Sequence, residues 1–163
     1  MNFAELLLFG ATAGLGATIF TDLFAFLRQG TKATHTFYCM VGRWIGSLPR
    51  QGIFYDDIRA SPPVVGEAIL GWSAHVILGI FFGISFALLF GASAFNAPQI
   101  WQGLSFGLAT VLVPWLVFQP LFGWGLAMSN APTPWRMRLK GMITHTVFGL
   151  GLWVCIVAMN ALL

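Results

Sequence analysis

Four long apolar stretches constrain this chain more than any other feature of its sequence. They cover residues 3–27, 67–90, 99–127 and 139–163. A helix of roughly 20 residues, rising 1.5 Å per residue, crosses the ~30 Å hydrocarbon core of a bilayer. Only 8% of the residues are charged, which is too few to cover a water-soluble fold. The sequence therefore predicts one all-α integral membrane domain over residues 1–163 with four transmembrane helices, the third kinked at Pro114 and Pro120.

The positive charges predict how these helices are oriented. The segment 28–66 and the region that joins the third stretch to the start of the fourth hold every Lys and Arg of the chain: Arg28, Lys32, Arg43, Arg50, Arg59, Arg136, Arg138 and Lys140. Under the positive-inside rule, these segments face the cytoplasm and both termini face the periplasm of an inner membrane. The net charge of +3 is then a topology signal, and we expect no nucleic-acid partner.

The cytoplasmic segment 28–66 contains an amphipathic pattern. Phe37, Val41, Trp44, Ile45 and Leu48 recur at helical spacing. This pattern predicts a short interfacial helix lying on the cytoplasmic leaflet.

An internal repeat links the second and fourth stretches. Each contains a glycine, a histidine and a glycine spaced four apart, at a constant offset of 70 residues: Gly71, His75 and Gly79, and Gly141, His145 and Gly149. The first and third stretches match more weakly. The pattern favours a duplicated pair of helical hairpins.

Small residues spaced four apart also mark the first stretch, at Gly14 and Thr18, followed by Asp22. Residues four apart share one face of a helix, and small residues there let two helix backbones approach closely in a membrane. We therefore expect the helices to pack through Gly14 and through the glycines of the repeat.

Each stretch carries one polar side chain within its small-residue stripe, and the helical rise places all four roughly 8–13 Å from the cytoplasmic end. These residues are Asp22, His75, Gln119 and His145. An isolated charge at such a depth costs about 3 kcal/mol or more, so it persists when it is paired or functional. We expect Asp22, His75 and His145 to form one cluster, with Thr18 and Gln119 as further hydrogen-bond candidates for Asp22.

Three interpretations of this polar layer stay open at the level of sequence. It is a hydrogen-bonded structural cluster, as in an accessory subunit that packs as a homo-oligomer or against a larger membrane complex through its glycine stripes. It is a binding or proton-relay site of a small transporter, because histidine exchanges protons near neutral pH. Or it is a cofactor site, in which His75 and His145 bind a haem, or bind a metal together with Asp22. No phosphate-binding loop, nucleophile elbow or dinucleotide motif is present, so little supports an enzyme.

The same residues carry a resemblance over nearly the whole chain. Its motifs are Gly-Ala-Thr with Asp-Leu at 16–23, Val-Gly-Arg-Trp at 41–44, Leu-Pro-Arg at 48–50, Gly-Glu, Gly-Trp and His at 66–75, Gln-Pro at 119–120 and the stretch 145–152. The chain thereby resembles a family of bacterial inner-membrane proteins known only as a domain of unknown function. The resemblance implies a four-helix bacterial membrane protein and no particular activity.

Overall fold

The computed structural model describes residues 1–162, so Leu163, the end of the fourth predicted stretch, lies outside the described residues. The described part is helical throughout and has no strand. Its elements are α1 (Phe3–Gln29), α2 (Thr31–Gln51), η1 (Ile58–Ala60), α3 (Glu67–Phe90), α4 (Ser93–Asn96), α5 (Ile100–Thr110), η2 (Pro114–Phe118), α6 (Gln119–Leu121), η3 (Leu126–Met128) and α7 (Pro134–Leu162).

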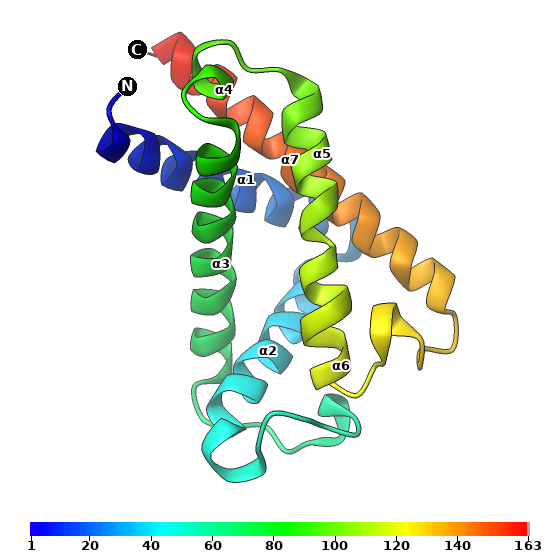
Figure 1. The fold of residues 1–163 in the computed structure, drawn as a ribbon. Helices are drawn as coiled ribbons and strands as arrows, with labels where there is room; N and C mark the ends of the chain where they lie inside the picture. Colours follow the sequence, from blue (N-terminus) through cyan, green and yellow to red (C-terminus); the bar gives the residue numbers. More distant parts are fainter. Residues whose placement is uncertain (163) are drawn as a thin grey trace.

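Four segments are long and apolar enough to cross a membrane, which confirms the predicted fold class. They are α1, α3, the span Ile100–Leu121 and α7. Both termini lie at the same end of the molecule as α4, and α6 and the far end of α2 lie at the other end (Figure 1). The chain is therefore a multi-pass helical membrane protein whose apolar helices face lipid.

The third span differs most from its predicted bounds. It begins at Ile100 and ends at Leu121, where the sequence predicts 99–127. Regular α5 ends at Thr110, and a π-helical turn begins at Pro114. Pro114 has no backbone N–H to donate and its ring crowds the preceding turn, so the α-helical ladder cannot continue through it. The fourth span begins at Pro134, ahead of the predicted 139, because proline is tolerated in the first turn of a helix.

The segment between the first two spans is more ordered than its sequence suggests. Gly30, with a φ of +82° that favours glycine, ends α1 and precedes α2. Helix α2 extends beyond the predicted interfacial helix and packs along the first turns of α3. A Cβ on Gly42 would collide with the Glu67 carbonyl oxygen, and one on Gly71 with the Tyr38 carbonyl oxygen. These two glycines therefore set the close approach of α2 and α3.

Ion pairs and hydrogen bonds hold the loop 52–66, which follows α2, against the start of α3. Arg43 binds both carboxylate oxygens of Glu67, at 2.9 and 3.0 Å, and donates to the Ser61 carbonyl at 2.7 Å. Asp57 pairs with Arg59 and accepts from the indole N–H of Trp124 at 3.4 Å. These ion pairs and hydrogen bonds hold the loop 52–66 against α2 and α3 in the first half of the chain and against Trp124 in the second half.

Glycines close the two antiparallel hairpins, as the sequence predicts. In the α1–α3 hairpin, a Cβ on Gly14 would lie 2.8 Å from Gly83 Cα, and Gly79 faces the side chain of Thr18. In the α5–α7 hairpin, Gly107 and Gly149 meet at a comparable backbone distance. Gly79 and Gly149 each face a neighbouring helix at close range. Helices α1 and α7 join the hairpins near Ala17 and Gly151. Ala17 belongs to a buried cluster of Ala, Phe, Leu and Ile side chains.

Candidate functional site

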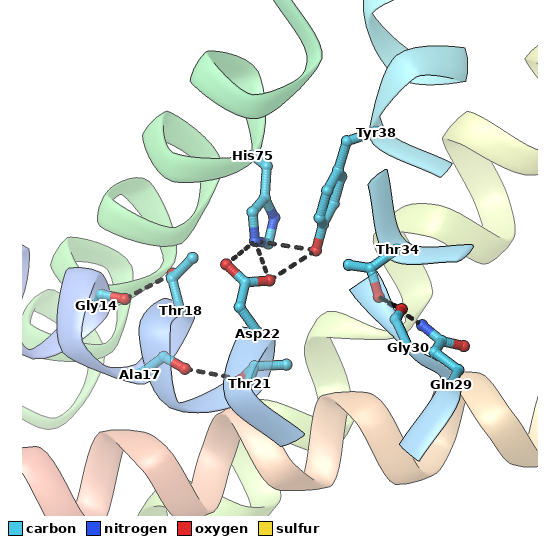
Figure 2. A network of polar contacts seen from close by, with 10 residues as sticks. All are labelled: Gly14, Ala17, Thr18, Thr21, Asp22, Gln29, Gly30, Thr34, Tyr38 and His75. Atoms are coloured by element: carbon cyan, nitrogen blue, oxygen red, sulfur yellow. Dashed lines mark hydrogen bonds and ion pairs between the residues drawn. The ribbon is translucent and has the colours of Figure 1, made fainter. Parts of the chain in front are cut away.

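Three polar side chains meet where α1, α2 and α3 converge (Figure 2). His75 Nε2 lies 3.0 Å from Asp22 Oδ1 and 3.2 Å from Asp22 Oδ2. The Tyr38 hydroxyl lies 3.1 Å from Asp22 Oδ1 and 3.0 Å from His75 Nε2. The side chains of Asp22 and His75 are 13% and 20% exposed. The Asp22–His75 pair is therefore largely buried, but both side chains keep some accessible surface.

With Asp22 ionised, each hydrogen bond of this network has one donor and one acceptor. The Tyr38 hydroxyl donates to Asp22, so it accepts from His75, and the His75 hydrogen is on Nε2, facing the carboxylate. The other ring nitrogen, Nδ1, has no hydrogen-bond partner within residues 1–162. A neutral imidazole in this tautomer can accept a proton at Nδ1, and the adjacent carboxylate stabilises the imidazolium that results.

Aromatic side chains hold His75 in this orientation. The Tyr38 ring stacks on the imidazole with centroids 4.1 Å apart, and the Trp72 ring packs 4.5 Å from that of Tyr38. The Trp72 indole N–H donates in turn to Nδ1 of His35 at 3.2 Å. Burial raises the pKa of the Tyr38 phenol above its usual value, and the charge of Asp22 raises this pKa further. Tyr38 therefore keeps its proton and remains a hydrogen-bond donor.

Thr18 lies one turn from Asp22 but does not donate to it. Its hydroxyl donates to the Gly14 carbonyl at 2.8 Å, and its side chain covers Gly79. A threonine bonded to its own helix in this way has no hydrogen left for the carboxylate. Thr18 therefore serves the contact between α1 and α3.

His145 is placed in a second, separate polar pair. Its Nδ1 lies 2.8 Å from the Thr110 hydroxyl, and that hydroxyl donates to the Gly107 carbonyl at 2.6 Å. Since a hydroxyl has one hydrogen, Nδ1 of His145 must be the donor to Thr110. No hydrogen bond or ion pair within the described residues joins His145 to Asp22 or His75.

The expectation of one cluster containing both histidines is therefore wrong. Helix α7 meets α1 at Gly151 and Cys155, farther along than His145. At the level of His145, its neighbour is α5, which brings Thr110 to the position that Asp22 occupies in the other hairpin. Because each histidine faces the helix that precedes it within its own hairpin, the two copies of the Gly-His-Gly pattern form two separate local pairs.

Gln119 belongs to neither pair. Its Oε1 atom is buried without a hydrogen-bond partner, as is the indole Nε1 of Trp115, four residues earlier. Gln119 directly follows the π-helical turn, whose altered register displaces it from the stripe that the sequence extrapolates through Pro114. The predicted link from Gln119 to Asp22 is not formed.

The geometry also bears on the cofactor hypothesis. Within residues 1–162 no group of three or more His, Cys, Asp and Glu side chains is arranged to hold a metal ion. Asp22 occupies Nε2 of His75, and His145 lies with Thr110 in the other hairpin. The set of Asp22, His75 and His145 that would bind a metal is thus not assembled.

Sequence reasoning missed Tyr38, which completes the site. The segment containing it was predicted as an interfacial connector, so its polar residues were not compared with those of the spans. The available signal was the spacing of Thr34, Tyr38 and Gly42, which continues the four-residue pattern seen in the transmembrane stretches. In the structure, that stripe is the face that α2 presents toward α1 and α3.

Comparison with known protein families gives a match over most of the chain. A family model described as "Protein of unknown function (DUF2938)" matches residues 11–159. No curated protein and no solved structure matches the chain. The matched region includes every residue of both polar pairs.

Proposed function

We propose that this chain, which belongs to the family described as protein of unknown function (DUF2938), carries protons across part of the membrane through Asp22 and His75, with Tyr38 holding the carboxylate in place, as the relay of a small transporter. The observation that carries this proposal is the 3.0 Å contact between an acid and an imidazole in an apolar hairpin. Ionisable residues inside membrane spans are rare, and they commonly mark ion or proton pathways.

The state of the network supports proton exchange. His75 has one nitrogen bound to the carboxylate and one unoccupied within the described chain. Proton uptake at Nδ1 would create an imidazolium beside the carboxylate, so the net charge of the pair would change from −1 to zero, which a low-dielectric interior favours. Tyr38 stays bonded to Asp22 in either state and limits movement of the carboxylate.

The second hairpin supplies an internal contrast. His145 has a neutral partner, Thr110, in place of a carboxylate. A proton placed on His145 would have no neighbouring anion to stabilise it. We therefore assign proton exchange to the first hairpin and a packing role to the second pair.

Proton flux into liposomes tests this proposal. The purified protein is reconstituted into vesicles containing a pH-sensitive dye, and an inward proton flux is driven by a potassium diffusion potential. We expect the wild-type protein to raise the flux above that of protein-free vesicles. Asp22→Asn and His75→Gln should each reduce the flux at least about tenfold, because each removes one partner of the relay.

His145→Gln is the matched control, since it removes a span histidine that has no acidic partner. It should retain the wild-type flux. A wild-type flux equal to that of empty vesicles would reject the relay, as would equal losses of flux in His75→Gln and His145→Gln. The Asp22–His75 pair would then serve only to hold α1 and α3 together.

The placement of charge supports a topology for this relay. The end of the molecule with the termini and α4 contains no Lys or Arg. All eight lie away from it, toward the opposite end, in the last turn of α1, in α2, in η1 and in the first two turns of α7. We propose that this opposite end faces the cytoplasm of a bacterial inner membrane and that both termini are periplasmic.

A further inference from the structure

We propose that the cleft around Trp72, between the end of α1, the start of α2 and the outer face of α3, binds a membrane lipid with an anionic head group. The proposal does not depend on proton transfer at Asp22. It concerns the neighbouring outer surface and the class of molecule that fits there.

The cleft is a shallow, open depression with two adjoining parts that share Trp72. One part, of about 360 Å³, is lined by Phe26, Thr31, Lys32, His35 and Trp72. The other, of about 420 Å³, continues along α3 past Ser73, Val76 and Ile77. The lining therefore combines one end that has a cation and one hydroxyl group with another end that is largely aliphatic.

Charge complementarity identifies the head group. No ion pair within residues 1–162 involves Lys32. His35 adds no positive charge in this state, because its Nδ1 accepts from the Trp72 indole and its Nε2–H faces the Cys39 sulfur at 3.4 Å. Lys32 is thus an unneutralised cation at the polar end of the cleft, and an anion is its natural partner.

The aliphatic end identifies the rest of the ligand. Ile77 is 65% exposed and lies in a span that faces lipid. An acyl chain lying along Val76 and Ile77 would cover apolar surface that a small polar anion would leave bare. A phospholipid whose head group carries a net negative charge joins both chemistries in one molecule, whereas a free phosphate or a lipid without net charge supplies only one.

Trp72 gives this cleft a contact with the candidate site. Its indole packs 4.5 Å from the Tyr38 ring and 6.1 Å from the His75 ring. A ligand held against the opposite side of Trp72 would restrict the aromatic stack that orients His75.

Lipid binding is measured on the full-length protein in an uncharged maltoside detergent, using native mass spectrometry to count retained lipids during titration. The probes are dioleoyl phosphatidylglycerol, dioleoyl phosphatidylcholine and glycerol 3-phosphate. We expect phosphatidylglycerol to bind more tightly than phosphatidylcholine, with no retention of glycerol 3-phosphate. Lys32→Gln should weaken phosphatidylglycerol binding about fivefold, as expected for loss of one basic residue near a lipid charge.

Lys140→Gln is the matched control, because Lys140 is an exposed lysine on α7, away from the cleft. It should bind phosphatidylglycerol like the wild type. Ile77→Trp, which fills the aliphatic end, should weaken both phospholipids and provides a second variant with an intact charge.

Equal affinity for the two phospholipids would overturn the proposal, as would equal effects of Lys32→Gln and Lys140→Gln, which would indicate nonspecific attraction to the basic end. Retention of glycerol 3-phosphate at the affinity of the lipid would show an anion site with no lipid specificity and would also overturn it.

Discussion

Asp22 is held by two donors that come from two different helices. Tyr38 of α2 and His75 of α3 both reach its carboxylate, whereas Thr18 on its own helix does not. An ionised carboxylate in an apolar span is tolerated only while such donors are present. The state of Asp22 therefore depends on how α2 and α3 are placed, and the three side chains act as one unit.

The first prediction follows from this dependence. His75→Leu should destabilise the protein by about 3 kcal/mol, because it leaves the Asp22 charge with a single donor. The double variant with Asp22→Leu should be more stable than His75→Leu alone, since the unpaired charge is then removed. Unfolding of the purified variants in mixed micelles measures both.

His145→Leu serves as the control for the loss of a span histidine, because it leaves only the neutral Thr110 behind. It should cost less than His75→Leu. A double variant less stable than both single variants would show that Asp22 and His75 contribute independently.

At the scale of whole helices, the repeated glycines have unequal surroundings. Gly71 and Gly141 occupy the same place in the repeat, yet Gly71 touches the backbone of α2, which has no counterpart in the second hairpin. A Cβ on Gly141 would lie 3.4 Å from Trp115 Nε1 and 3.5 Å from Val111 Cγ2, ordinary contact distances. Because α2 packs against α3 at Gly71, only glycine allows the close helix approach at that position, whereas Gly141 is under no such constraint.

The second prediction compares these two positions. Gly71→Ala should destabilise the protein by roughly 1–3 kcal/mol, because its Cβ would force α2 away from α3. Gly141→Ala should be neutral or slightly stabilising, since alanine favours the helix and its Cβ would make only ordinary van der Waals contacts. Thermal unfolding in detergent distinguishes them, and equal effects would contradict the close approach of α2 to α3.

For the molecule as a whole, one end carries the basic residues and the other carries the termini. Exposed Ser93 lies in α4 at the end with the termini, and exposed Ser129 lies in the connection before α7 at the basic end. These two serines are therefore suited to test the proposed orientation.

The third prediction uses single cysteines in a background with Cys39→Ser and Cys155→Ser. With a membrane-impermeant thiol reagent, Ser93→Cys should be labelled in intact cells. Ser129→Cys should be labelled only after the inner membrane is opened. The reverse pattern would invert the proposed topology and place the basic connections outside.

The candidate site could be predicted only in part from the chain. Asp22 and His75 were identified as an unusual charge and an unusual histidine within apolar stretches, and the structure pairs them. Tyr38 was missed because α2 was treated as separate from the spans. Gln119 was placed wrongly because the π-helical turn at Pro114 changes the helical register beyond it.

The sequence by itself determined that the chain has four apolar helices that pack through glycines. Span length and small-residue spacing are local properties, and the bilayer and the helical repeat convert them directly into structure. Which polar groups meet was decided by tertiary structure. That choice depends on where the helices cross and on the insertion of α2 beside α3, so two histidines in identical local patterns acquired different partners, a carboxylate for His75 and a hydroxyl for His145.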